Sequence, residues 1–491
     1  MIHFSKKIWA TMALALVACS GMAQQLTLLQ INDTYELTPL SGQGGMTRVA
    51  TLRKQLVKEN PATLLVHAGD FLNPSVLSAL SYQGKRISGK QMIETLNAVG
   101  LDYTAFGNHE FDVKEADLLA RLDESRFEWL AANVWHKTPQ GQIPFSRTGQ
   151  AAFPKSVIRK INGLRVGIIG VTIPLEKDFV LCTDPFTAAK TEYNRLKDST
   201  DFVIAITHQS IDADKQLAKE LPALKLIIGG HEHDNTAQQV GETLIRKADA
   251  NAKTAYIHRI NFDAATQKVS IVSELKKVDA SLPDDSATAA VVSRWQQIAT
   301  EGIKAVGFDA AEVLMQVKGE PLDGLEATVR NKHGKLTDII AAAMLTHSKH
   351  AQAAIVNGGS VRIDDRLTGT VTAYDLMRIV PFGGGLVEMQ IKGADLQKLL
   401  DAGLKNKGTG GYLHYANISE SKKGWKINGK KLIPAKYYNI ITTEFLFTGK
   451  EANMDFLIPQ NPNIRNIDTP KTDDIRADIR KVIADYMRKI K

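Results

Sequence analysis

Five hydrophobic runs of this chain each end in side chains that commonly bind metals. The runs cover residues 26–33, 63–70, 101–112, 202–208 and 223–234. The side chains at their ends are Asp33, Asp70, Asn108, His208, His231 and His233. Carboxylate, amide and imidazole ligands in this number suit two hard or borderline metal ions rather than one structural zinc ion.

A centre of this kind needs strands whose ends meet. Each run is continuous rather than alternating, which is typical of a strand that is buried on both faces of a mainly parallel sheet. Loops at the carboxyl ends of such strands share one crevice. The sequence therefore predicts that the five ends meet, with Asp70 bridging two metal ions through its two carboxylate oxygens.

The segment GNHEFD at 107–112 adds a second kind of chemistry. His109 is next to Asn108 and is placed to contact a substrate instead of a metal. Asp112, three residues further on, can orient the imidazole of His109. A charged imidazole there would stabilise phosphoryl oxygens or protonate a leaving oxygen. The same residue pattern is also typical of a helix cap, and the two roles are compatible.

Length and composition limit the class of protein. A chain of 491 residues is too long to fold around a single hydrophobic core, so we expect two or three domains. Hydrophobic content of 44% and charged content of 23% are typical of a soluble globular protein. The net charge of +8 is dispersed, and no nucleic acid polymer is expected as a partner.

Residues 1–23 have the pattern of a signal peptide, with Lys6 and Lys7 before an apolar run at 8–18. Cleavage after Ala23 predicts a periplasmic or secreted protein. The alternative is a lipobox that ends at Cys19, which would anchor the chain to a membrane by lipid. Removal of the signal peptide leaves Cys182 as the single cysteine, so no intrachain disulfide is expected.

The rest of the chain divides in three. Residues 24–275 alternate between strand and helix patterns. Residues 276–325 are polar, contain Pro283 and then become helical, which is typical of a linker. Residues 326–491 form a second domain that ends in a charged helix.

The motifs together resemble a known superfamily. Asn32-Asp33, Gly69-Asp70, GNHEFD, Thr207-His208 and GGHEHD at 229–234 resemble the calcineurin-like metallophosphoesterases. NGGSVR at 357–362, VTAYDLMRIVPFGG at 371–384 and TTEFLFTG at 442–449 narrow the resemblance to bacterial 5'-nucleotidases and UDP-sugar hydrolases. The resemblance implies an α/β chain with a four-layer αββα metallophosphatase domain, a helical linker and an α+β C-terminal substrate-binding domain.

The resemblance also implies roles for individual residues. One metal ion would be held by Asp33, Asp70 and His233. The other would be held by Asp70, Asn108, His208 and His231. The catalytic pair would be His109 and Asp112. The substrate would be bound by Arg330, Asn357, Arg362, Phe382 and Phe445.

Two positions depart from the family pattern. Tyr35 stands where the family has a histidine ligand, and a phenol with a pKa of about 10 is a poor ligand for zinc or manganese. The first metal site would then be weakened, hold another metal such as iron, or use Glu36 or water. Glu451 stands where the family has an aspartate that contacts ribose, and its contact with substrate is left open.

The sequence as a whole predicts a secreted phosphohydrolase with two divalent metal ions (Mn, Zn, Co or Mg, with iron as the option that Tyr35 adds). A metal-bound hydroxide would attack nucleoside 5'-monophosphates. The alternatives are a UDP-sugar or cyclic-nucleotide phosphodiesterase, and a non-catalytic nucleotide-binding protein if Tyr35 disables one metal site. Another phosphate ester is also a possible substrate. The membrane is a partner only if Cys19 is lipidated, and the oligomeric state is not predicted.

Overall fold

Runs of Leu, Ile and Val build two six-stranded sheets in the N-terminal half of the protein. The computed structural model describes residues 24–422 and 424–490, so the expected signal peptide lies outside the described residues. The first sheet has the order β18-β17-β1-β2-β5-β6. Its strands are β1 (Gln24–Ile31), β2 (Thr63–His67), β5 (Tyr103–Ala105), β6 (Glu128–Leu130), β17 (Thr254–Asp263) and β18 (Lys268–Lys277).

The second sheet has the order β15-β16-β14-β13-β10-β9. Its strands are β9 (Ser156–Ile161), β10 (Leu164–Thr172), β13 (Phe202–His208), β14 (Leu226–Gly229), β15 (Thr236–Val240) and β16 (Thr243–Lys247). The central strands of both sheets run parallel. Antiparallel pairing is found at the β17–β18 edge of the first sheet and at both edges of the second, β9 and β15, whereas β6 pairs in parallel with β5.

The five strands that precede the donor residues are divided between the two sheets, as an αββα domain requires. Three of them (β1, β2, β5) lie in the first sheet and two (β13, β14) in the second. A continuous apolar run indicates burial on both faces but does not identify the neighbouring strand. Strand β16 pairs in parallel with β14 on one side and antiparallel with β15 on the other.

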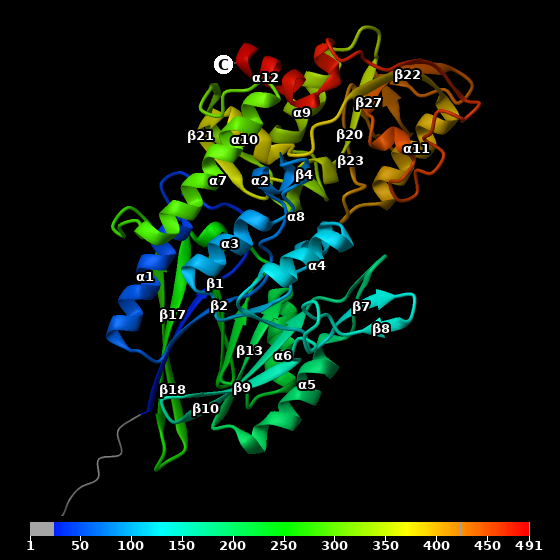
Figure 1. The fold of residues 1–491 in the computed structure, drawn as a ribbon. Helices are drawn as coiled ribbons and strands as arrows, with labels where there is room; N and C mark the ends of the chain where they lie inside the picture. Colours follow the sequence, from blue (N-terminus) through cyan, green and yellow to red (C-terminus); the bar gives the residue numbers. More distant parts are fainter. Residues whose placement is uncertain (1–23, 423, 491) are drawn as a thin grey trace, which may run out of the picture.

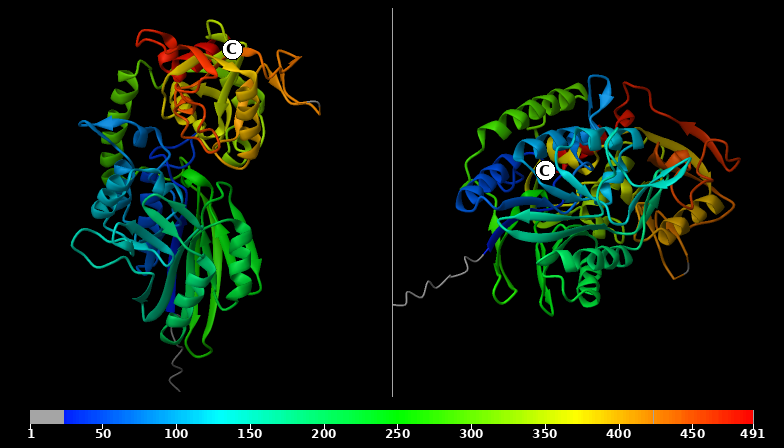
Figure 2. Two further views of the ribbon diagram at one scale, coloured as in Figure 1. Left: turned by 90° about the vertical axis from the view of Figure 1, so that its right-hand side faces the viewer. Right: turned by 60° about the horizontal axis from the view of Figure 1, so that its bottom comes forward.

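The two sheets face each other across an apolar layer that includes Leu28, Val66, Ile204 and Ile228. Helices cover the outer faces: α1 (Met46–Glu59), α3 (Lys90–Val99) and α4 (Glu115–Glu124) on the first sheet, α5 (Pro185–Leu196) and α6 (Ile211–Glu220) on the second. The expected αββα layering is confirmed, and it is visible in Figures 1 and 2.

Smaller elements complete the N-terminal half. A four-stranded sheet contains β11 (Leu175–Lys177), β12 (Val180–Cys182), β7 (Val134–Thr138) and β8 (Gly141–Ile143). Cys182 is buried there, and burial raises the pKa of its thiol to about 12, so it is not a reactive thiolate. A short helix and hairpin follow β2, with the bounds α2 (Val76–Ala79), β3 (Ser81–Tyr82) and β4 (Lys85–Arg86).

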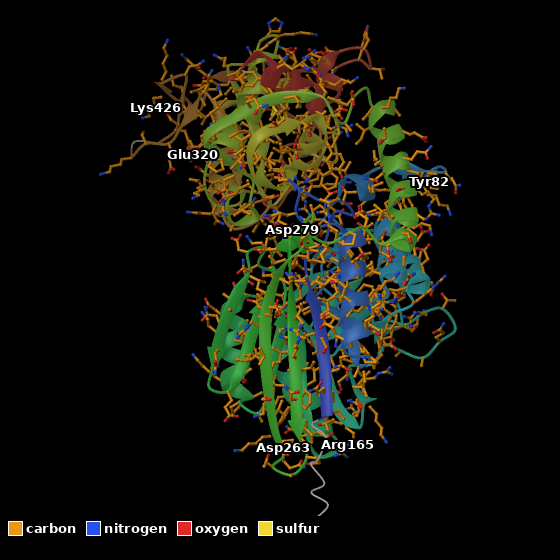
Figure 3. The ribbon with its side chains drawn as sticks, turned by 90° about the vertical axis from the view of Figure 1, so that its left-hand side faces the viewer. Tyr82, Arg165, Asp263, Asp279, Glu320 and Lys426 are labelled. Atoms are coloured by element: carbon orange, nitrogen blue, oxygen red, sulfur yellow. The ribbon has the colours of Figure 1, made fainter. Side chains whose placement is uncertain are left out.

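Helix α7 (Ser286–Ala305) packs against both halves of the protein. Val292, Trp295 and Ala299 belong to the core that lies under the first sheet. Ile303, near the end of the helix, belongs to the core of the C-terminal half. Tyr82 packs on Trp295 with ring centres 5.9 Å apart, and Figure 3 labels it beside this helix.

The C-terminal half is built on a five-stranded sheet with the order β23-β20-β27-β22-β28. Its strands are β20 (Ala353–Asn357), β22 (Leu386–Lys392), β23 (Leu413–Ala416), β27 (Tyr437–Thr443) and β28 (Ile464–Asp468). Alternate residues of β20 belong to different cores: Ala354 and Val356 to one, Ala353 and Ile355 to the other. Both faces of this sheet are therefore covered.

The covering helices are α9 (Lys335–Thr346), α10 (Ala373–Ile379) and α12 (Ile479–Lys489) on one face and α11 (Gly393–Lys405) on the other. The remaining elements are β19 (Val313–Asp323), β21 (Arg366–Thr372), α8 (Glu326–Val329) and a projecting arm of β24 (Ile418–Ser419), β25 (Lys426–Ile427) and β26 (Lys430–Lys431). Figure 3 labels Lys426 on this arm. Among the described residues, no helix has the length and apolar character needed to cross a bilayer.

Candidate metal centre and active site

The carboxyl ends of the central strands of both sheets point toward the C-terminal half. Figure 3 labels Asp279 at this junction, and Arg165 and Asp263 at the opposite end of the sheets. Asp33 and Asp70 follow β1 and β2, and His208 is the last residue of β13. The ligand atoms of these three buried side chains lie within 4.8 Å of one another. Strand ends from two facing sheets thus meet at one cluster.

Three further predicted donors join this cluster. The Asn108 Oδ1 atom lies 3.2 Å from His208 Nε2, and His233 Nε2 lies 3.6 Å from Asp33 Oδ1. The ring of His231 lies edge-on to the ring of His208, with centres 5.3 Å apart. All six predicted metal donors therefore gather at one place.

The separations between donors fit metal coordination. Zinc lies about 2.0–2.2 Å from nitrogen and oxygen ligands, so two ligands of one ion are roughly 3.0–3.5 Å apart at tetrahedral or octahedral angles. The Nε2 atom of His208 lies 3.0 Å from Asp70 Oδ2 and 3.2 Å from Asn108 Oδ1. Oxygen and imidazole donors at these separations are suited to borderline divalent ions.

The electrostatics of the cluster favour a cation. Burial acts to lower the pKa of His208, but the carboxylates of Asp70 and Asp33 raise it to about 9. Burial acts to raise the pKa of Asp70, and the neighbouring histidines His208 and His109 hold it well below its ordinary value. The two buried carboxylates therefore stay ionised and attract positive charge.

Glycines allow the loops to approach one another closely. A Cβ atom on Gly107 would lie 2.0 Å from Asp70 Oδ1, and one on Gly230 would lie 2.5 Å from the carbonyl oxygen of Ala68. Any other residue at either position would push the strand ends apart. The Gly next to the donors in GNHEFD and GGHEHD is thus required by packing.

Tyr35 lies inside the cluster. Its hydroxyl is 3.2 Å from His233 Nε2 and 3.4 Å from Asp70 Oδ2. Burial and the nearby carboxylates of Asp70 and Asp33 raise the pKa of this phenol well above its ordinary value. The carboxylate of Glu36, considered above as a replacement ligand, contacts the C-terminal half, where it accepts a 2.5 Å hydrogen bond from the Tyr374 hydroxyl and lies 3.9 Å from Arg378.

The pair His109 and Asp112 adjoins the cluster in a 3₁₀ turn, His109–Asp112. The backbone N–H of His109 donates to Asp70 Oδ1 at 2.7 Å. The Nδ1 atom of the His109 ring lies 2.7 Å from Asp112 Oδ2. Burial acts to lower the pKa of His109, but Asp70 and Asp112 raise it overall. The arrangement favours an imidazolium that is oriented by Asp112.

Glu110 organises the same loops and was missed by the sequence analysis. Its buried carboxylate accepts hydrogen bonds from the backbone N–H groups of Asp70 (2.9 Å), Phe71 (2.7 Å) and Gly107 (2.6 Å). Burial, followed by the charge of Asp70, raises the pKa of Glu110 to about 7. The position of a glutamate between His109 and Asp112, both assigned roles in the GNHEFD motif, was the available signal for this role.

Lys247 is a second buried group behind the metal donors. Its ammonium donates to the Gly230 carbonyl at 2.8 Å and pairs with Asp214 at 3.0 Å and with Glu232. Both Lys247 and Asp214 are fully buried. Lys247 therefore fixes the loop that carries His231 and His233.

Replacement of Lys247 by methionine is expected to lower the free energy of unfolding by about 3–5 kcal/mol, because Asp214 is left as an unpaired buried charge. Urea unfolding followed by fluorescence measures the change. Lys225→Met is the matched control, since Lys225 forms a surface pair with Glu242 at 2.8 Å. Equal stability of Lys247→Met and Lys225→Met would contradict this assignment.

The C-terminal half contributes two arginines near the catalytic pair. The Arg362 guanidinium donates to Asp112 Oδ2 at 2.7 Å. Arg330 pairs with Glu326, whose Oε2 atom lies 3.7 Å from His109 Nε2. The predicted substrate arginines therefore lie on the side of His109 that faces away from the sheets.

A cleft of about 400 Å³ separates the two halves at this point. Its walls include Asp70, His109, His231, His233, Glu326, Arg330 and Asp364. Predicted metal donors, the predicted catalytic histidine and a predicted substrate arginine thus line one solvent-accessible space.

Asn357 is the last residue of β20, and the two phenylalanines lie in the loops before β22 and after β27. Asn357 is buried and donates to Glu451 Oε2 at 3.1 Å, so Glu451 faces the NGGSVR loop.

Phe382 and Phe445 are half exposed, at 50% and 49%. Their loops are joined where Glu444 N–H donates to the Gly385 carbonyl at 2.9 Å. The centre of the Phe382 ring lies 5.9 Å from Arg362 Cζ, which connects the aromatic position to the catalytic pair.

A buried ionic network joins the two halves beside the cluster and was not predicted. Arg378 lies 3.9 Å from Glu36, 3.1 Å from Asp365 and 3.2 Å from Asp375. Asp365 also pairs with Lys253 at 3.1 Å. The groups come from segments far apart in the sequence, which is why periodicity and spacing gave no sign of them.

A buried cluster of carboxylates and imidazoles at the ends of two facing sheets, beside an oriented histidine and arginines, defines a metal-dependent hydrolase of phosphoric esters. Comparisons with known families agree. Residues 26–235 match the calcineurin-like phosphoesterase family, and residues 313–457 match the 5'-nucleotidase C-terminal domain family. The chain belongs to the 5'-nucleotidase family of the calcineurin-like metallophosphoesterases.

Individual relatives and solved structures share both halves. The chain is 26% identical to 5'-nucleotidase of Homo sapiens over 83% of this chain and 78% of that protein. It is 25% identical to protein UshA of Escherichia coli over 90% of each chain. The crystal structure of a 5'-nucleotidase precursor from Thermus thermophilus has the same fold, with a TM-score of 0.70, 22% identity and coverage of 95% of this chain and 97% of that chain.

Proposed function

We propose that this protein is a 5'-nucleotidase that hydrolyses nucleoside 5'-monophosphates. The observation that carries the proposal is the position of the His109–Asp112 pair, which contacts the metal cluster through Asp70 and the C-terminal half through Arg362. An arginine fork binds phosphate oxygens in two-pronged fashion, so a phosphate held there lies beside the imidazole. The names of the relatives support the same substrate class.

The proposal includes two divalent metal ions. Asp33, Asp70 and His233 would hold one ion, and Asp70, Asn108, His208 and His231 would hold the other. When bound, such ions supply Lewis acidity, which polarises phosphoryl oxygens and makes water more acidic. The shared residue is Asp70, whose two oxygens have different neighbours: Oδ2 faces His208 and Oδ1 accepts from the His109 N–H.

His109 is proposed to act directly on the reacting phosphate. Its imidazolium, oriented by Asp112, would donate a hydrogen bond to a phosphoryl oxygen or a proton to the leaving 5' oxygen. Arg362 pairs with Asp112 in this structure and would move a short distance to a phosphate oxygen. The cleft that His109 and Arg330 line is consistent with a small phosphate ester.

The C-terminal half is proposed to bind the nucleoside. Arg330, Asn357 and Arg362 would contact its polar groups, and Phe382 and Phe445 would stack on its base. Action in the periplasm or outside the cell is part of the proposal, and its support is the signal-like pattern of residues 1–23.

A substrate panel tests the proposal. AMP, UDP-glucose, 2',3'-cyclic AMP and an aryl phosphate would be assayed with manganese, zinc, cobalt and iron, and bound metal would be quantified. We expect the highest kcat/KM with AMP and two equivalents of metal. Nucleotide binding without turnover under every metal would contradict the proposed function.

Replacement of Phe382 or Phe445 by alanine is expected to raise the KM for AMP about tenfold, because roughly 1–3 kcal/mol of base stacking is lost. Steady-state kinetics would measure KM and kcat separately. Glycerol phosphate, which has no base, should show little change. Tyr82→Ala removes an exposed aromatic ring outside the cleft and is the matched control. Equal KM increases for AMP and glycerol phosphate would argue against stacking.

A further inference from the structure

The loop at 362–365 reaches from the C-terminal half to three separate groups of the N-terminal half. Arg362 donates to Asp112 of the catalytic pair at 2.7 Å. Asp364 contacts the predicted metal ligand His233. Asp365 pairs with Lys253 at 3.1 Å. One short segment of the C-terminal half therefore contacts both the catalytic pair and the metal cluster.

The contact between Asp364 and His233 uses the ring nitrogen that faces away from the cluster. His233 Nδ1 lies 2.9 Å from Asp364 Oδ2 and 3.2 Å from the Asp364 carbonyl oxygen. His233 Nε2, on the other side of the ring, faces Asp33 Oδ1 at 3.6 Å. A proton on Nδ1 that is bonded to Asp364 leaves the lone pair of Nε2 directed at the cluster.

Asp364 is itself held in place. Its Oδ1 atom accepts a hydrogen bond from the Glu326 N–H at 2.5 Å, and its side chain is 19% exposed. Its backbone has φ of +41°, a conformation in which Asp and Asn are enriched among residues other than glycine. The carboxylate is thus fixed in direction before any metal binds.

We infer that Asp364 is a positioning residue for His233, so that retention of the metal ion held by Asp33, Asp70 and His233 depends on a carboxylate of the C-terminal half. The inference rests on the proposed role of His233 as a ligand. A carboxylate bonded to the distal nitrogen of a ligating histidine fixes its tautomer and increases its basicity as a ligand.

Tyr35 makes this support more important in the present chain. With tyrosine where the family has a histidine, the ion beside Asp33 has three proposed protein ligands, and His233 is the single imidazole among them. The Tyr35 hydroxyl lies 3.2 Å from His233 Nε2 and is placed to donate to the same lone pair that a metal ion would use. Asp364 holds the opposite edge of the ring at 2.9 Å, so Nε2 keeps its direction toward the cluster.

Cobalt binding to the full-length protein tests the inference. After metal removal with a chelator, Co²⁺ would be titrated into the wild type, Asp364→Ala and Asp364→Asn, and the visible absorption would report each site. We expect one of two Co²⁺ ions to bind about 10–100-fold more weakly in Asp364→Ala, with the other unchanged. Asp364→Asn, which suits the same backbone conformation and keeps an acceptor without charge, should have an intermediate affinity.

Two reference variants separate failure of this inference from failure of the proposed function. Asp365→Asn changes the same loop and weakens the ion pairs of Asp365 with Lys253 and Arg378. Asp365 contacts none of the proposed metal ligands, so the Co²⁺ affinities of this variant should stay within about twofold of the wild type, as expected for an intact ligand shell. His233→Ala should weaken the same ion as Asp364→Ala, and the double variant should be no weaker than His233→Ala alone.

Each outcome is decisive. If His233→Ala leaves both affinities unchanged, the proposed ligand role of His233 fails. If His233→Ala weakens one ion and neither Asp364 variant does, the positioning role is overturned while the proposed function stands. Circular dichroism would verify folding, and a destabilised Asp364→Ala would leave Asp364→Asn to carry the comparison.

Discussion

Replacement of Asp70 by alanine is expected to lower kcat/KM for AMP by at least about 10³-fold, because a two-metal centre supplies several kcal/mol of transition-state stabilisation and each 1.36 kcal/mol is a factor of ten. Asp70 is the one carboxylate proposed to contact both ions, and it also accepts the His109 N–H at 2.7 Å. Its loss would therefore disturb the metal centre and the catalytic turn together. Steady-state kinetics and metal content would be measured on the same preparation.

A remote carboxylate provides the control for this variant. Asp201 pairs with Arg165 at 2.8 Å, at the end of the sheets opposite the cluster, and Figure 3 labels Arg165 there. Asp201→Ala should leave kcat/KM and metal content unchanged. A less than tenfold loss in Asp70→Ala, with two metal equivalents retained, would remove the central assumption of the proposed mechanism.

Much of this centre was predictable because its donors follow strands directly. His208 is the last residue of β13, and Asp33, Asp70 and the GGHEHD histidines follow β1, β2 and β14 within a few residues. Strand ends are the places where an α/β fold brings side chains together. The αββα layering was predicted from the resemblance. The assignment of the strands to two sheets was not predictable from the runs, since apolar content does not specify neighbours.

The contacts between the two halves could not be predicted for a different reason. Tyr374 donates to Glu36 across 338 residues of sequence, and no periodicity links the two. The role of Glu110 also depends on tertiary structure, because its carboxylate accepts hydrogen bonds from the backbone N–H groups of two loops that only the fold brings together. Local pattern identifies donors, whereas the groups that hold the donors in place depend on how distant segments pack.

Replacement of His109 by asparagine is expected to lower kcat for AMP by about 10²–10⁴-fold, the usual contribution of general acid–base catalysis. Metal content should stay at the wild-type value, because the His109 side chain bonds to Asp112 and not to the metal donors. A large loss of kcat with unchanged metal content would show that His109 acts in catalysis and not as a metal ligand. His136→Asn, which breaks a 2.6 Å contact with Glu115 outside the cluster, is the matched control.

The leaving group distinguishes the two actions open to His109. If its imidazolium protonates the leaving oxygen, His109→Asn should lose much more activity with AMP, which releases an alkoxide, than with an aryl phosphate, which releases a stable phenolate. If it instead stabilises the phosphoryl oxygens, both substrates should lose equally. The 2.7 Å contact with Asp112 and the raised pKa of His109 favour the protonated imidazole that both actions require, so the comparison of the two substrates decides between them. Full activity of His109→Asn with both substrates would exclude either role.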